Sequence, residues 1–98
     1  MDKNEAIAIA KKYKAKLAKY LPLKAVYLFG SYSKGGYTAE SDIDIAVVVS
    51  HRSGNYFKDM PLLQKIGRKV SSLIEPILLT DDTINPLYAD ILKTGILI

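Results

Sequence analysis

The sequence contains no cysteine and a single histidine, and it has no apolar run longer than a strand. Without cysteine the chain can form neither a disulfide nor a thiolate-ligated zinc site, and this composition fits a cytoplasmic protein. Lysines interrupt the apolar residues of the N-terminal segment throughout, and the longest apolar runs, such as 45–49, are strand-sized. We therefore expect neither a signal peptide nor a membrane span.

Hydrophobic residues make up 49% of the chain, which is enough for one core and argues against intrinsic disorder. Its 98 residues contain no repeat and no linker, so we expect a single domain over residues 1–98. Because so short a domain buries a modest share of its surface, an oligomer or a partner chain would add to its stability.

The formal net charge is +4, and much of the excess lies in the first 20 residues. A basic face of this kind can attract nucleic acid, a nucleotide or an acidic protein. A solvated, lysine-rich helix is the simpler interpretation. No arginine cluster or interleaved aromatic residues accompany the lysines, so direct nucleic-acid binding is not expected. The lysines concerned are Lys3, Lys11, Lys12, Lys14, Lys16 and Lys19.

The spacing of apolar residues predicts helices and strands that alternate along the chain. Segments with helical spacing are predicted at residues 3–20, 56–74 and 83–94. Short, mainly apolar segments are predicted as strands at 24–29, 43–50 and 75–80, and the second of these is rich in β-branched residues. Pro76 indicates either an edge position or a strand start for the last of these strands, and the tail 96–98 is expected to add a short strand or pack on the core. The order predicts an α/β fold, α+β by some schemes, with a small sheet flanked by helices.

Asp42 and Asp44 lie where the second predicted strand begins. Side chains two residues apart on a strand point to the same face, so these carboxylates would repel each other unless a cation lay between them. Magnesium prefers such oxygen ligands together with substrate phosphates. Taken alone, a pair of this kind is more often a solvated feature of a strand end.

Gly30 and Ser31 directly follow the first predicted strand. Glycine permits a sharp bend and the close approach of a phosphate. A short helix starting at Ser31 would direct free N–H groups to the same place, and the hydroxyl could donate to a phosphate oxygen. Alternatively, Ser31 is only a helix N-cap. Lys34 in the same loop is a candidate phosphate contact or a solvated lysine, and Tyr32 is expected near any bound nucleotide.

Glu75 opens the third predicted strand. A third carboxylate there could bridge to the metal or accept a proton from an attacking hydroxyl. The alternative is a solvated strand-start residue, because Pro76 follows it. His51 lies in a polar loop without a second histidine, so we expect an exposed residue rather than a zinc ligand.

The segment 29–49, FGSYSKGGYTAESDIDIAVVV, resembles the signature of the DNA polymerase β-like nucleotidyltransferase superfamily. More narrowly, it is similar to the minimal nucleotidyltransferases of bacteria and archaea. The matching positions are Gly30, Ser31, Gly35, Ser41, Asp42 and Asp44. The likeness extends more loosely to the end of the chain. Two positions depart from the family pattern: only Lys34 is charged between Ser31 and Gly35, and the third acid is Glu75 rather than an aspartate.

The resemblance implies a nucleotidyltransferase fold with a mixed sheet, and transfer of a nucleoside monophosphate, expected to be AMP, from ATP to a hydroxyl. It implies Mg²⁺, or alternatively Mn²⁺, held by Asp42, Asp44 and Glu75. The nucleotide would be bound by Gly30, Ser31, Lys34, Gly35 and Ser41.

The resemblance also implies a partner. Many minimal members act as antitoxins of a HEPN-domain toxin, in a hetero-oligomer, and some add AMP to one of its tyrosines. A second hypothesis is an antitoxin that binds nucleotide without catalysis and neutralises its partner by binding alone. A third is the catalytic half of a larger nucleic-acid enzyme, whose acceptor-binding surface a partner supplies.

Overall fold

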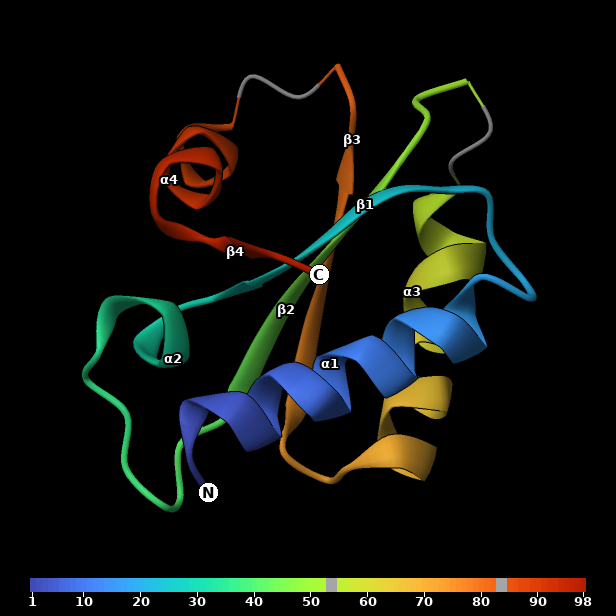
Figure 1. The fold of residues 1–98 in the computed structure, drawn as a ribbon. Helices are drawn as coiled ribbons and strands as arrows, with labels where there is room; N and C mark the ends of the chain where they lie inside the picture. The colour runs from blue at the N-terminus through green and yellow to red at the C-terminus, as the bar shows by residue number, and fades with distance from the viewer. Residues whose placement is uncertain (53–54, 83–84) are drawn as a thin grey trace.

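The computed structural model describes residues 1–52, 55–82 and 85–98 (Figure 1). The predicted order of helices and strands is confirmed. The predicted start of the last helix, at residue 83, and part of the predicted loop at 51–55 lie outside the described residues. In chain order the elements are α1 (Lys3–Leu17), β1 (Leu23–Phe29), α2 (Ser31–Lys34), β2 (Ile43–Val49), α3 (Tyr56–Val70), β3 (Ile74–Thr80), α4 (Pro86–Thr94) and β4 (Ile96–Leu97).

The strands form one mixed sheet in the order β3-β2-β1-β4. β2 runs antiparallel to β1 and parallel to β3, while β4 pairs antiparallel with β1 at Tyr27 and Leu28. Pro76 therefore lies on an edge strand, one of the two predicted positions, where its missing N–H can face away from the sheet. The expected short strand at the C-terminus is also confirmed.

Helices cover both faces of the sheet, with α4 on the opposite side from α1 and α3 (Figure 1). Tyr13 of α1 and Leu63 of α3 pack with Ile45 and the other odd-numbered residues of β2. Ile91 of α4 packs with Ala46 and its neighbours on the other face. β2 is thus buried on both faces, which explains why its sequence is almost continuously apolar. Asp44 points to the α4 side, because it is two residues from Ala46.

The long helices end earlier than their apolar patterns predicted. α1 ends at Leu17 rather than residue 20, since the N–H groups of Tyr20 and Leu21 both donate to the Leu17 carbonyl in a turn. α3 ends at Val70 rather than residue 74, because Ser71 has an extended backbone and Ile74 already pairs with Ile43 of β2. None of the described helices combines the length and apolar character needed to cross a bilayer.

Candidate active site

Gly30 forms the bend that ends β1 and starts α2. Its backbone angles, φ 71° and ψ −144°, fall in a region that only glycine adopts readily. Gly30 is itself the N-cap, and Ser31 is the first helical residue, so the alternative that Ser31 is only an N-cap is wrong. The single turn of α2 then closes at Gly35, whose φ of 93° is left-handed and whose N–H donates to the Ser31 carbonyl.

Asp44 lies directly against this bend. It pairs across the sheet with Phe29, the residue before Gly30. A Cβ added to Gly30 would overlap Asp44 Oδ2 and would lie only 3.1 Å from Asp44 Cγ. The absence of a side chain at position 30 therefore makes room for this carboxylate. The Gly30 bend and the start of β2 are thus in direct contact.

The three acidic residues singled out from the sequence gather at the same end of the sheet. Glu75 pairs with Asp44 across the parallel strands β2 and β3, so both side chains lie on the face that α4 packs against. Asp42 is exposed and directly precedes β2. The pKa of Asp44 is raised above its ordinary value, first by burial and then by the charges of Asp42 and Glu75.

No cation of the described residues neutralises this group. The ion pairs within residues 1–52, 55–82 and 85–98 are Lys34–Asp90 and His51–Asp81, and neither involves Asp42, Asp44 or Glu75. An oxygen-only donor set with excess negative charge is the chemistry that Mg²⁺ takes in proteins. The residues therefore fit a bound magnesium ion, which would supply the missing positive charge.

The other residues predicted to bind nucleotide hold the loop in shape. Ser41 Oγ accepts a hydrogen bond of 2.8 Å from the Thr38 backbone N–H, which closes a turn just before β2. Lys34 Nζ pairs with Asp90 Oδ2 of α4 at 2.9 Å, a partner that sequence reasoning missed. Nothing in the sequence signals that contact, because 56 residues separate the two. Ser31 is half-buried at the bend.

Tyr32 does not present its ring to a nucleotide. The side chain is fully buried in the core under α1, and it stacks on Tyr37 with ring centroids 4.8 Å apart. The expectation that it borders a bound nucleotide is therefore wrong for the ring, because core residues and Tyr37 already contact it. A pocket of about 170 Å³ lies at the β3 edge beside Glu75, but Gln64 and Arg68 in its lining belong to α3, on the sheet face away from Asp44.

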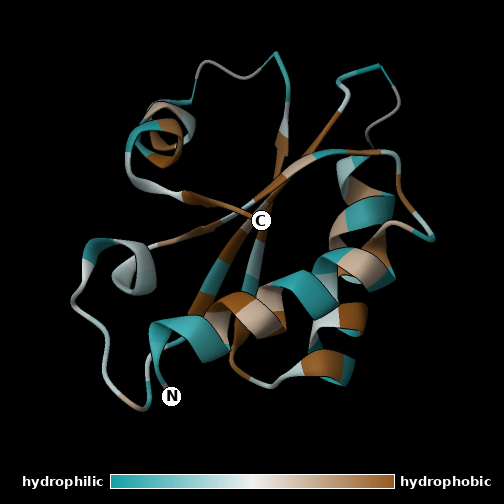
Figure 2. Ribbon diagram, viewed as in Figure 1, coloured by the Kyte–Doolittle hydropathy of each residue, from teal (hydrophilic) through white to brown (hydrophobic). Residues whose placement is uncertain are grey.

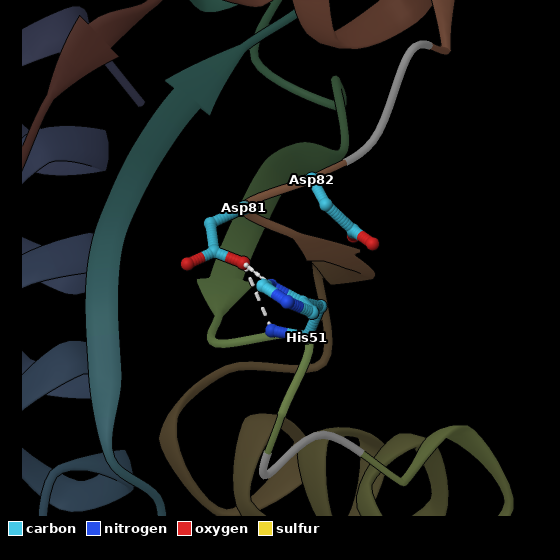
Figure 3. Close-up of side chains that lie close together, drawn as sticks. All are labelled: His51, Asp81 and Asp82. Atoms are coloured by element: carbon cyan, nitrogen blue, oxygen red, sulfur yellow. Dashed lines mark hydrogen bonds and ion pairs between the residues drawn. The ribbon is translucent and has the colours of Figure 1, made fainter.

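A second cluster of titratable residues lies at the other end of β2 and β3 (Figure 3). His51, Asp81 and Asp82 follow these strands and are exposed, as expected for His51. Their potential ligand atoms lie within 4.8 Å of one another, a closeness that Asp42, Asp44 and Glu75 do not reach among the described residues. Figure 3 shows the imidazole of His51 against Asp81, whose Oδ1 is 2.7 Å from Nδ1 and 2.9 Å from the His51 backbone nitrogen.

The His51–Asp81 contact explains this second cluster as an ion pair that joins the ends of two parallel strands. Hydrogen bonding to Asp81 raises the pKa of His51, and the same contact lowers the pKa of Asp81. The imidazole thus has an internal partner. Among the described residues, the positive-φ glycines lie only in the Gly30–Gly35 loop, so the described part of this end of the sheet lacks a bend like that at Gly30.

Known proteins match most of this chain. Residues 11–98 match the family model described as polymerase beta, nucleotidyltransferase. Over 96 residues the chain is 36% identical to a Methanocaldococcus jannaschii protein provisionally named a protein adenylyltransferase, covering 94% of this chain and 95% of the relative.

Solved structures show the same fold. The crystal structure of a provisionally named nucleotidyltransferase from Sulfolobus solfataricus has a TM-score of 0.72 at 27% identity, covering 97% of this chain and 80% of that one. A crystal structure of a toxin–antitoxin with AMP-PNP has a TM-score of 0.62 at 26% identity, covering 99% and 72%.

Proposed function

The chain belongs to the polymerase beta nucleotidyltransferase family, and we propose that it transfers AMP from ATP to a hydroxyl group of a partner protein. The observation that carries the proposal is the position of Asp44, which lies against the Gly30 bend and beside Glu75. The provisional name of the M. jannaschii relative and the AMP-PNP of the toxin–antitoxin structure support adenylyl transfer from ATP.

The bend would bind the triphosphate. Gly30 has no side chain to obstruct a phosphate, and the Ser31 hydroxyl at the start of α2 can donate to a phosphate oxygen. Gly35 and Ser41 would keep the loop in the shape that binds the nucleotide. Lys34 would contact phosphate after exchanging its Asp90 partner for the ligand.

The carboxylates would hold the metal. Asp42 and Asp44 would ligate Mg²⁺, or alternatively Mn²⁺, with Glu75 as the third acidic ligand. When bound, the ion supplies positive charge to the triphosphate and to the leaving pyrophosphate. This role accounts for three carboxylates gathered without an internal cation, which would otherwise only destabilise the fold.

Glu75 would act on the acceptor. The acceptor oxygen attacks the α-phosphorus, the bond from that phosphorus to the bridging oxygen breaks, and pyrophosphate leaves with its electron pair. The hydroxyl proton passes to the exposed Glu75 carboxylate. Glu75 is exposed on the edge strand β3, so an acceptor side chain can approach it from solvent.

For the partner we propose a toxin of the HEPN class, with one of its tyrosines as the acceptor, in a hetero-oligomer. The toxin–antitoxin structure with AMP-PNP, which matches nearly the whole chain, supports a toxin as the partner, and the HEPN class and the tyrosine acceptor rest on the family resemblance. The acceptor hydroxyl then comes from a second protein.

The test follows label from [α-³²P]ATP onto the proposed toxin partner in the presence of Mg²⁺, with the protein encoded by the neighbouring gene as the first candidate, because many members of the family that the sequence resembles are encoded beside their toxin. We expect Asp42→Ala/Asp44→Ala to reduce transfer by at least about 100-fold, because the metal ligands are lost. The matched control is Asp81→Ala/Asp82→Ala, which removes two carboxylates from the other end of the sheet and should retain transfer.

Glu75→Gln tests the proton acceptor separately, since it keeps the shape of the side chain and removes its basicity. We expect transfer to fall by about 10–100-fold while ATP binding persists. Transfer that is unchanged in the Asp42/Asp44 double variant would overturn the enzymatic proposal. Full neutralisation of the toxin by that same variant would instead favour an antitoxin that acts by binding alone.

A further inference from the structure

Acidic residues are absent from two long stretches of the sequence. None occurs between Glu5 and Glu40, and none between Asp59 and Glu75. These stretches contain most of α1 and α3, which pack together on the sheet face away from Asp44. Figure 2 shows hydrophilic turns along both helices. We define the lysine face by its exposed members, Lys12, Lys16, Lys19, Lys65 and Lys69.

The centre of the lysine face is hollowed. Lys16, Lys19 and Lys69 line a pocket of about 130 Å³ together with Tyr20 and Ile66. Tyr20 is 64% exposed although it is large and aromatic, whereas Ile66 is buried and forms an apolar wall. Three ammonium groups thus surround a small apolar surface that is open to a ligand.

These lysines have no acidic partner within the part of the chain that the structure describes. Lys14 shows the contrast, because its Nζ donates to the carbonyl of Ile98 at 2.7 Å. Lys12 and Lys16 are one helical turn apart, so their like charges repel. The helix dipole favours a cation such as Lys16 in the last turn of α1. It does not account for Lys19, which lies beyond that helix, or for the open pocket beside it.

We propose that the lysine face is a docking surface for an acidic segment of a partner protein. Carboxylates of the segment would pair with Lys16, Lys19 and Lys69, and an apolar side chain would lie against Tyr20 and Ile66. The charge of the face matches such a segment, and the apolar wall matches an aliphatic side chain between acidic ones. A protein segment is favoured over nucleic acid because no guanidinium group lines the pocket, and arginine is the residue that grips phosphates in two-point contacts.

This surface is separate from the proposed active site. α1 and α3 cover one face of the sheet, whereas Asp44 and Glu75 point to the other. Docking at the lysine face would therefore hold a partner while leaving the Gly30 bend open to nucleotide. The inference goes beyond the proposed function and stands whether or not the chain transfers AMP.

The test measures binding of a fluorescein-labelled peptide, about 15 residues long, in which glutamate and leucine recur at helical spacing. The same peptide with glutamine in place of glutamate, and a single-stranded RNA of similar length, serve as the alternative probes. Fluorescence anisotropy is recorded at about 150 mM salt, where long-range attraction between exposed charges is largely screened.

Two charge-reversed variants of the full chain are compared. Lys16→Glu/Lys19→Glu/Lys69→Glu changes the pocket, and Lys3→Glu/Lys24→Glu/Lys93→Glu makes the same change of net charge at exposed lysines elsewhere. Circular dichroism checks that each variant folds. Tyr20→Ala is a milder variant that removes the exposed ring without altering charge.

We expect the acidic peptide to bind the wild-type chain, and the pocket variant to lose at least about tenfold in affinity while the control keeps its affinity. Tyr20→Ala should lose affinity by a smaller factor, and the glutamine peptide should bind weakly. Equal losses in both triple variants, tighter binding of the RNA, or no binding of the acidic peptide by the wild-type chain would each overturn the proposal. ATP binding, measured in parallel, should be the same in all variants.

Discussion

The carboxylate of Asp44 lies in the space where any residue other than glycine would place its Cβ at position 30. Two segments that are 14 positions apart in the sequence are thereby fitted to each other. The backbone of Gly30 adopts angles that other residues avoid. A side chain at position 30 would also displace the carboxylate of Asp44.

The glycines of this loop should differ sharply in their tolerance of alanine. Gly30→Ala combines a disfavoured backbone with an overlap against Asp44, so we expect a thermal midpoint lower by roughly 5–15 °C and at least about tenfold slower adenylyl transfer. Gly35→Ala should carry only the backbone penalty, because nothing lies within 4 Å of its added Cβ. Gly36→Ala, which has open space and no positive φ, is the control and should match the wild type in scanning calorimetry.

Asp44 should destabilise the metal-free chain at neutral pH. Its pKa is raised in the folded state, so the folded chain binds the proton more tightly than the unfolded chain does. Proton binding by Asp44 therefore stabilises the folded chain. This stabilisation is complete below the ordinary pKa of 3.8 and is lost as the pH rises through the pKa of the folded state. We expect Asp44→Asn to raise the thermal midpoint by a few degrees at pH 7 in the presence of chelator.

Magnesium with a non-hydrolysable ATP analogue should reverse that order, stabilising the wild type more than Asp44→Asn. Glu40→Gln, which removes an exposed carboxylate from the preceding loop, is the control and should behave as the wild type in both conditions. A lower midpoint of metal-free Asp44→Asn would contradict the assignment of an unneutralised carboxylate cluster.

The His51–Asp81 pair should give the stability a second dependence on pH. The pKa of His51 is raised above 6.5, so its contribution is complete below that value and is lost as the pH rises through the folded pKa. The pKa of Asp81 is lowered below 3.8, so its contribution is present above that value and is lost as the pH falls through the folded pKa. The pair is exposed, and we expect a small effect that is largest at about pH 5.

NMR titration of the imidazole provides the direct measurement for this pair. His51 should titrate above 6.5 in the wild type and closer to 6.5 in Asp81→Asn. Asp82→Asn should lower the value less, because Asp82 acts through charge alone whereas Asp81 also accepts the hydrogen bond. Identical titration curves for the wild type and Asp81→Asn would show that the ion pair does not form in solution.

Asp90 should compete with nucleotide for Lys34. The two side chains are about half exposed, so breaking their pair should change stability by less than about 1 kcal/mol. If Lys34 must leave Asp90 to contact phosphate, Asp90→Ala should tighten ATP binding by roughly two- to fivefold. Lys34→Ala should weaken binding, and the double variant should resemble Lys34→Ala, as measured by calorimetry. Weaker ATP binding by Asp90→Ala would argue against this competition.

The order of elements was predictable because each helix and strand carries its own apolar period. Where the long helices end was not, since the ends depend on contacts beyond the helix, such as the pairing of Ile74 with Ile43. Pro76 restricted β3 to an edge position or a strand start, because a proline cannot donate a backbone hydrogen bond, but it did not decide between the two.

Most of the candidate site was predictable because its residues are close in sequence, and Glu75 could be added because it opens the next predicted strand. Gly30, Ser31, Asp42 and Asp44 carry a combined pattern, and the structure brings the Gly30 bend and Asp44 together as that pattern implies. The partners of Lys34 and His51 are 56 and 30 residues away, and no local pattern connects them. Tyr32 was misplaced because its neighbour Ser31 lies at the bend, whereas a helical turn directs the tyrosine into the core.

The parallel pairing of β2 with β3 has a consequence for newly synthesised protein. A ribosome that has completed residues 1–73 has already made both halves of the Gly30–Asp44 contact, but the strand that carries Glu75 comes only after the α3 crossover. Synthesis therefore produces Gly30 and Asp44, which are proposed to bind the nucleotide and the metal, before Glu75, which is proposed to accept the proton. Partly built chains would remain inert toward an acceptor until β3 had paired with β2.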